Sequence, residues 1–152
     1  IRHIGMVLRL YEQAGIGMED KVIELLREFD VLPLAETMFR SLSRGESYKG
    51  ALVALLAVDP ELWLFDEPYA SGMDPNGLAA FRRHAREAAD RGRTVIYSTQ
   101  ILEVAERFSD RVCILHNHRI AAFASVDELR AGGEEDGDVL ATVFRQLQAD
   151  SA

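Results

Sequence analysis

The chain has 152 residues, a length typical of one compact domain or of two small lobes. Hydrophobic residues make up 48% and charged residues 28%, which is a globular composition. The 17 basic and 25 acidic residues give a net charge of −8, which argues against a main role in binding nucleic acid. The single cysteine excludes an internal disulfide. The longest apolar run, residues 51–58, is far shorter than the roughly 20 residues that cross a bilayer.

The first part of the chain predicts helices. Apolar residues recur at helical spacing over 4–11 and 22–29, with glycines ending the first segment and Pro33 ending the second. A third helix begins near Gly45 and stops before the Asp-Pro pair at 59–60. We therefore expect an α-helical subdomain over residues 1–59.

From residue 60 the hydrophobic period changes. Short apolar runs at 62–65 and 94–98 are typical of buried strands in a parallel sheet, with a helix between them that begins at Asp74-Pro75. A third strand is expected over 112–115. This alternation of strands and helices predicts an α/β fold over residues 60–131, with a mostly parallel sheet and flanking helices.

The end of the chain predicts smaller elements. Residues 116–119 indicate a hairpin turn into a strand over 120–124, and Ser125 with Glu128 forms a capping box that opens a short helix. Residues 132–152 are expected to form an acidic loop and a C-terminal helix. Cys113 is expected in the core, and His84 on a solvated helix face.

Two adjacent acids, Asp66 and Glu67, follow the first predicted strand. The carboxyl ends of parallel strands are where open α/β sheets bind their ligands. Two neighbouring carboxylates are costly there unless a metal ion or a proton relieves their repulsion. The alternative is a solvated acidic turn.

Two turns flank this strand in the sequence. Residues 41–46 open a helix with serine, glycine and free backbone amides, which suits an anion. The alternative is an ordinary cap, in which the Ser43 side chain accepts from Glu46. Residues 71–74 form a second tight turn that caps the next helix.

In this order and spacing, the segments resemble the nucleotide-binding domain of ATP-binding cassette (ABC) transporters, and the resemblance covers about residues 1–148. Leu42–Glu46 is similar to the signature motif, and Leu62–Glu67 to the Walker B strand with its catalytic glutamate. Ser71–Asp74 is similar to the D-loop, and 95–100 to the strand that leads to the switch position. The pattern is most similar to subunits of ABC-2-type or multidrug exporters.

The resemblance implies a role for each matching residue. Asp66 would hold the Mg²⁺ of bound ATP, usually through water, and Glu67 would polarise the attacking water. Ser43 and the amide of Gly45 would contact the γ-phosphate of a nucleotide held by a partner subunit. Asp74 would communicate across the dimer interface.

The sequence departs from the family pattern within these motifs. Arg44 and Glu46 replace the usual glycine and glutamine of the signature, and Arg44 retains the ability to donate to phosphate. Gln100 stands at the position of the switch histidine; its amide can bond the γ-phosphate but cannot become cationic. We therefore expect slow or altered hydrolysis, tested by comparing Gln100→His with the parent.

The largest departure is that the sequence contains no phosphate-binding loop. The three glycine pairs five residues apart are followed by Ala51, Leu78 and Asp138, and never by lysine. The resemblance implies that this Walker A loop and the Q-loop precede residue 1, so that the chain is the C-terminal portion of a cassette with a partial P-loop NTPase core. Alone it is expected to be inactive, to bind MgATP weakly and to expose unpaired strand edges.

The implied function is that of an ATP-binding and ATP-hydrolysing subunit, or a fragment of one, that drives transport across a membrane. The implied partners are a second nucleotide-binding domain, the N-terminal half of the cassette, and a transmembrane permease docking near residues 1–41. The implied location is the cytoplasmic side of the membrane. Two alternatives stay open: a catalytically incompetent cassette-like interaction module, and a DNA-repair type ATPase, against which the acidic charge counts.

Overall fold

The computed structural model describes residues 2–12, 15, 17–131 and 139–149. It divides into two compact units, Ile1–Ser98 and Thr99–Ala152. The expected boundary at 59/60 lies inside the first unit and stays a prediction; 132–138 and 150–152 of the expected C-terminal segment lie outside the described residues. No helix in the described ranges is long and apolar enough to cross a membrane.

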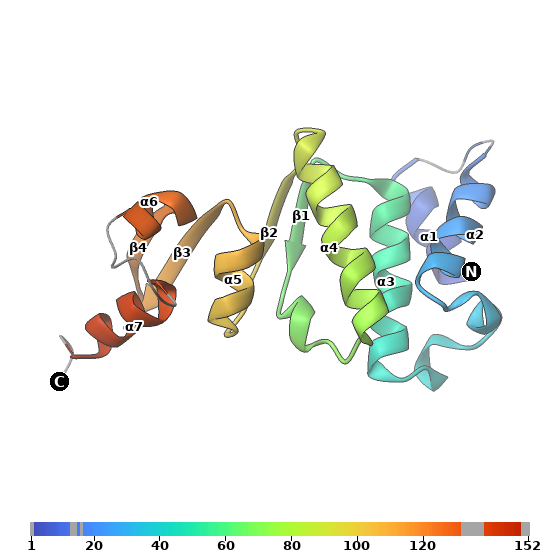
Figure 1. The fold of residues 1–152 in the computed structure, drawn as a ribbon. Coiled ribbons are helices and arrows are strands. Elements are labelled where there is room, and N and C mark those ends of the chain that lie inside the picture. The colour runs from blue at the N-terminus through green and yellow to red at the C-terminus, as the bar shows by residue number, and fades with distance from the viewer. Residues whose placement is uncertain (1, 13–14, 16, 132–138, 150–152) are drawn as a thin grey trace. The chain divides into compact units, whose positions relative to one another are not determined.

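The elements follow the order predicted from the sequence (Figure 1). Those of the first unit are α1 (Arg2–Leu10), α2 (Met18–Glu28), the 3-10 turns η1 (Leu32–Leu34) and η2 (Phe39–Ser41), α3 (Arg44–Val58), β1 (Leu62–Phe65), the 3-10 turn η3 (Pro68–Ala70), α4 (Pro75–Asp90) and β2 (Thr94–Tyr97). Those of the second unit are α5 (Leu102–Phe108), β3 (Arg111–His116), β4 (Arg119–Ser125), α6 (Val126–Ala131) and α7 (Val139–Ala149).

Helix α3 is central to the core of the first unit. It packs against α1 and α2 and also against α4, so its residues from Leu52 onward are buried almost all round. The apolar stripes of α1 and α2 supply the facing residues, including Leu8, Leu26 and Phe29. These are the stripes that the helical spacing predicts.

Strands β1 and β2 pair in parallel, with Trp63 opposite Val95 and Phe65 opposite Tyr97. One face of this pair is covered: Trp63 is 1% exposed, and the Phe65 ring packs edge-on against Phe81 of α4 at 4.9 Å between centroids. This parallel pair agrees with the α/β fold class that the sequence predicts.

The other face of the pair is apolar and open. Leu62, Leu64 and Ile96 alternate with the covered residues and are 49%, 64% and 54% exposed. Parallel sheets are normally covered on both faces, so this one leaves a hydrophobic surface without cover in the described structure. β2 has only β1 as a hydrogen-bonded neighbour among the described residues.

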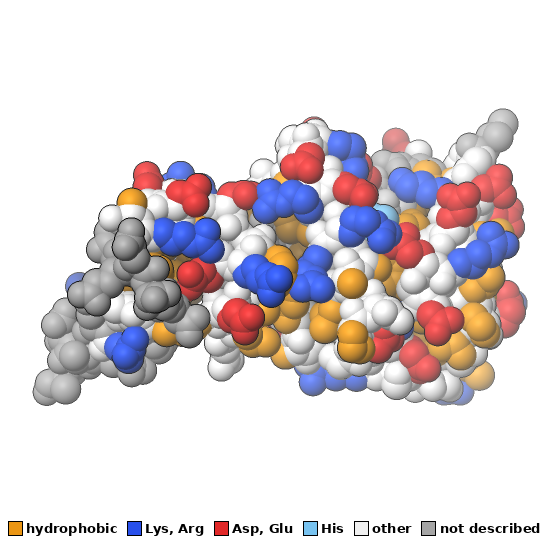
Figure 2. Space-filling model, in the orientation of Figure 1, with side chains coloured by type: hydrophobic (Ala, Val, Ile, Leu, Met, Phe, Trp, Pro, Cys, Tyr) orange, Lys and Arg blue, Asp and Glu red, His pale blue; other side chains and the backbone are white. Residues whose placement is uncertain are grey.

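Helix α4 has an apolar inner side and a basic outer side. Ala80, Phe81 and Ala88 face the core, while basic side chains gather over the helix in Figure 2. His84 corrects the prediction of a solvated histidine: its side chain is only 19% exposed, and Nε2 lies 2.9 Å from Oε1 of Glu28 on α2. The error arose because the sequence gives the neighbours of His84 on α4 but not those on α2.

The second unit contains the predicted hairpin of β3 and β4, which pair in antiparallel register. Its two turn residues, Asn117 and His118, both have positive φ, 47° and 61°, as a type I′ turn requires. Cys113 corrects a second expectation, because it is exposed rather than buried. It stands opposite the exposed Phe123 on an uncovered face of the hairpin.

Candidate functional site

The two predicted carboxylates lie where β1 ends, beside the end of β2. Asp66 and Glu67 follow Phe65 directly, and Ser98 follows the residue paired with Phe65 in the neighbouring strand. The Ser98 hydroxyl donates to Oδ1 of Asp66 at 2.7 Å and accepts from the backbone N–H of Glu67 at 2.9 Å. The parallel register therefore brings a third polar side chain to the acidic pair.

The chain reverses direction at Glu67. This residue has φ 46° and ψ 51°, in the left-handed region that costs a residue with a side chain about 1–2 kcal/mol. It also caps η3, in which the N–H of Ala70 donates to the Glu67 carbonyl at 3.0 Å, and Pro68 is buried. Two contacts therefore stabilise the left-handed conformation of Glu67: the 3-10 turn η3 that follows it, and the hydrogen bond from its N–H to Ser98.

Tyr48 lies in the second turn of helix α3 and is half-buried. Burial raises the pKa of its phenol, and the negative charge of Asp66 raises that pKa further. The second cause requires the two groups to lie close enough to interact.

The predicted signature turn forms the start of α3. Ser43 is the N-cap residue: its hydroxyl accepts from the N–H of Glu46 at 3.2 Å, and Oε2 of Glu46 accepts from the N–H of Ser43 at 2.7 Å. These hydrogen bonds hold the pKa of Glu46 below its usual range. In this structure Ser43 makes the ordinary cap that the sequence offered as an alternative, and Arg44 is exposed.

Gly45 packs directly against the predicted D-loop. A Cβ atom at this position would lie 2.9 Å from the carbonyl carbon of Gly72 and closer still to its oxygen. Gly72 itself has φ +85°, the left-handed conformation that favours glycine. The two glycines therefore allow two backbone segments to touch, one from each motif.

Lys49 joins the same two segments through its side chain. It lies one turn after Gly45, is 8% exposed, and forms an ion pair with Asp74. Asp74 is the N-cap of α4, as predicted, and accepts from the N–H of Gly77 at 2.8 Å. The Lys49 hydrogen bond, followed by that of Gly77, holds the pKa of Asp74 below its usual range.

The structure therefore brings some of the predicted site residues together, but not all of them. Asp66 and Glu67 lie together with Ser98, and the signature turn lies against the turn that precedes α4. Gln100 is exposed and precedes α5 in the second unit, and it is described with that unit only.

Sequence reasoning missed Ser98 and Lys49 as parts of these contacts. A signal for Ser98 was available, since it follows a strand expected to be parallel to the one before Asp66. A signal for Lys49 was also available, because a lysine on an otherwise apolar helix face requires a charged partner.

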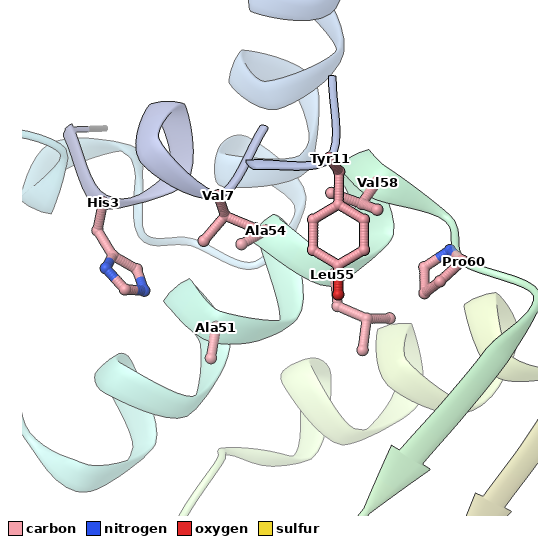
Figure 3. A pocket seen from close by; sticks show the side chains of 8 residues that line it. All are labelled: His3, Val7, Tyr11, Ala51, Ala54, Leu55, Val58 and Pro60. Atoms are coloured by element: carbon pink, nitrogen blue, oxygen red, sulfur yellow. The ribbon is translucent and has the colours of Figure 1, made fainter. Parts of the chain in front are cut away.

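A shallow apolar pocket of about 190 Å³ lies between α1 and α3 (Figure 3). Its side chains come from both helices and from the segment after each. They are His3, Val7, Tyr11, Ala51, Ala54, Leu55, Val58 and Pro60. None of its lining residues belongs to the acidic edge of the sheet, so the pocket is separate from that edge.

The arrangement of α3, α4 and the parallel strands is that of an ABC-type ATP-binding subunit. A solved structure of the ATP binding subunit of an ABC transporter matches with a TM-score of 0.82 and 29% identity, covering 95% of this chain and 62% of that one. No protein-family model matches the chain.

Sequence relatives agree with the structural match. The daunorubicin resistance ATP-binding protein DrrA3 of Streptomyces coeruleorubidus is 35% identical over 138 residues, which are 91% of this chain and 43% of that protein. The ABC-type transporter ATP-binding protein EcsA of Bacillus subtilis (strain 168) is 31% identical over 130 residues, 86% of this chain and 52% of EcsA. The chain is thus homologous to ABC transporter ATP-binding proteins, and it spans about half the length of these relatives.

Proposed function

We propose that this chain is part of the ATP-binding and ATP-hydrolysing subunit of an ABC transporter. The observation that supports this function most directly is the acidic pair at the carboxyl end of β1, held by Ser98, the residue that follows β2. This is the edge at which open α/β sheets bind their ligands. Homology to ABC transporter ATP-binding proteins over most of the chain supports the same function.

The donor set fits Mg²⁺ bound to a nucleotide. The described residues contain no group of three or more metal-ligating side chains, but Asp66 and Glu67 supply two carboxylates. Mg²⁺ retains several waters and is usually held by one or two carboxylates together with substrate phosphates. When bound, it would neutralise charge on the phosphates.

Each carboxylate has its own task in this proposal. Asp66 holds the cation through water, while Glu67 accepts a hydrogen bond from the attacking water and orients it. Phosphoryl transfer depends on positioning and electrostatics, so the fixed backbone of Glu67 matters as much as its charge. Gln100 bonds the γ-phosphate through its amide, without the positive charge that a histidine can carry.

The signature turn serves a nucleotide held by a second subunit. The Ser43 hydroxyl and the Gly45 amide contact its γ-phosphate, and the exposed Arg44 adds positive charge. Glu46 orients Ser43 through their capping box. Asp74 lies at the interface with that subunit, with 49% of its side chain exposed.

The proposed partners cover two apolar surfaces of the first unit, which are the pocket beside α1 and the open face of the β1–β2 pair. A transmembrane permease docks on the part of the chain that contains α1, where the pocket in Figure 3 accepts apolar side chains. This places the subunit at the cytoplasmic face of a membrane. The open face of the β1–β2 pair packs against the rest of the cassette.

A metal titration tests the proposed site. We expect Mn²⁺·ATP, added to the ¹⁵N-labelled chain, to broaden the amide signals of Asp66 and Glu67 first. Asp66→Asn should remove this broadening, whereas Asp127→Asn, at an exposed acid of the second unit, should leave it unchanged. Broadening spread over the acidic surface and insensitive to Asp66→Asn would contradict the assignment.

A turnover assay separates the proposed function from a cassette-like interaction module, which Gln100 favours. The chain is mixed with the part of DrrA3 that it does not match, and ATP hydrolysis is measured. We expect hydrolysis in the mixture and a loss of about 100-fold or more in Glu67→Gln. Binding between the two polypeptides without hydrolysis would favour the module.

A further inference from the structure

The Ser98 hydroxyl contacts both acids of the candidate site at once. Its hydrogen goes to Oδ1 of Asp66 at 2.7 Å, and its lone pair accepts the Glu67 N–H at 2.9 Å. A hydroxyl has one hydrogen to donate and two lone pairs, so both bonds form without competition. The backbone N–H of Ser98 also donates to the Phe65 carbonyl at 3.0 Å.

Both hydrogen bonds of the Ser98 hydroxyl restrain groups that a metal site must hold in place: the carboxylate of Asp66 and the backbone of Glu67. The bond to Asp66 occupies Oδ1, which fixes the rotation of the carboxylate and leaves Oδ2 for a cation or its water. The bond to the Glu67 amide stabilises a left-handed backbone that would otherwise cost about 1–2 kcal/mol. One side chain therefore orients the Asp66 carboxylate and fixes the backbone from which the Glu67 side chain extends.

We infer that Ser98 is a positioning residue of the metal site; this inference rests on the proposed function. Ser98 does not touch the cation and acts only through Asp66 and Glu67. Carboxylates that hold metals are commonly oriented by hydrogen bonds from an outer shell, and loss of such a partner typically costs about 10- to 100-fold in metal affinity. The register of β1 and β2 brings Ser98 beside Asp66, where its hydroxyl can act on that carboxylate.

The effect on metal binding is separable from any effect on folding. Ser98 is exposed, and the pairing of β1 with β2 depends on backbone hydrogen bonds and on the buried Trp63. Substitutions at exposed positions usually change the stability of the fold little. A variant without the hydroxyl loses two hydrogen bonds but no core contact, so it should still fold, with a loss of about 1–2 kcal/mol in the free energy of unfolding.

Mn²⁺ alone is the probe, and amide broadening at Asp66 and Glu67 is the readout. Ser98→Thr keeps the hydroxyl, whereas Ser98→Val has nearly the same shape without it. We expect Ser98→Thr to bind Mn²⁺ like the parent, and Ser98→Val and Ser98→Ala to require at least about tenfold more Mn²⁺ for half-maximal broadening. Ser125→Ala, which removes a hydroxyl in the second unit, is the matched control.

The outcomes separate the inference from the proposed function. Absence of broadening at Asp66 and Glu67 in the parent chain, both with Mn²⁺ alone and with Mn²⁺·ATP, would overturn the metal site itself. Broadening in the parent with equal Mn²⁺ affinity in Ser98→Thr and Ser98→Val would overturn only the positioning role. Because the threonine and valine variants share one shape, their comparison remains decisive even if Ser98→Ala unfolds.

Discussion

Gly45→Ala tests the contact between the signature turn and the predicted D-loop. The added methyl would lie 2.9 Å from the carbonyl carbon of Gly72 and 3.4 Å from the backbone nitrogen of Met73. Both neighbours are backbone atoms, which cannot rotate away as a side chain can. Overpacking of this kind costs about 1–3 kcal/mol. The better helix propensity of alanine returns about 0.5–1 kcal/mol, so we expect a net loss near 1–2 kcal/mol in the free energy of unfolding.

The same helix offers the control. At Gly50 a Cβ would lie 3.6 Å from Cε2 of Phe39, an ordinary contact, so Gly50→Ala should stabilise the first unit by about 0.5–1 kcal/mol. Urea unfolding is followed by the fluorescence of Trp63, the single tryptophan, which is buried in that unit. A Gly45→Ala chain as stable as Gly50→Ala would refute the packing argument.

Three further predictions concern other contacts. Lys49→Met should lower the stability of the first unit by about 1–2 kcal/mol at pH 7 by urea unfolding. Because the ion pair lowers the pKa of Asp74 in the folded chain, this stabilisation is present above pH 4 and is lost as the pH falls below it, so the deficit of Lys49→Met should shrink near pH 3. Ser125→Ala should destabilise α6 by about 1 kcal/mol, measured by hydrogen exchange of the amides in its first turn. The exposed faces should make the chain self-associate in sedimentation experiments, and Leu64→Lys should reduce this association; a monomeric parent chain at every concentration would contradict the prediction.

The order of elements was predictable because local chemistry decides it. Asp74 before Pro75 marks a helix start, and the structure begins α4 at Pro75 with Asp74 as the cap. Asn117 and His118 lie between two apolar runs, and both adopt the positive φ of a tight hairpin turn. In these cases the residues that determine the conformation lie within four positions of one another.

The errors arose where contacts join distant segments. His84 was expected in solvent, but Glu28, 56 positions earlier, accepts its hydrogen bond. Cys113 was expected in the core because its strand is apolar, yet the hairpin has an uncovered face on which it lies. Residue type alone does not tell which face of an element is covered.

The candidate site depends both on local sequence signals and on contacts between distant segments. Its motifs were visible in the sequence, but two residues that were given no role there, Lys49 and Ser98, make the contacts that hold them. The contacts differ in a way that matters for experiment. Gly45 and Asp74 are bound into the packing between α3 and α4, so variants at these positions change the stability of the fold together with any nucleotide chemistry. Asp66 and Ser98 are exposed, and substitutions there alter the acidic edge of the sheet while the core beneath it stays intact. Metal binding measured at these two residues therefore reports on chemistry, whereas the signature turn requires stability to be measured first.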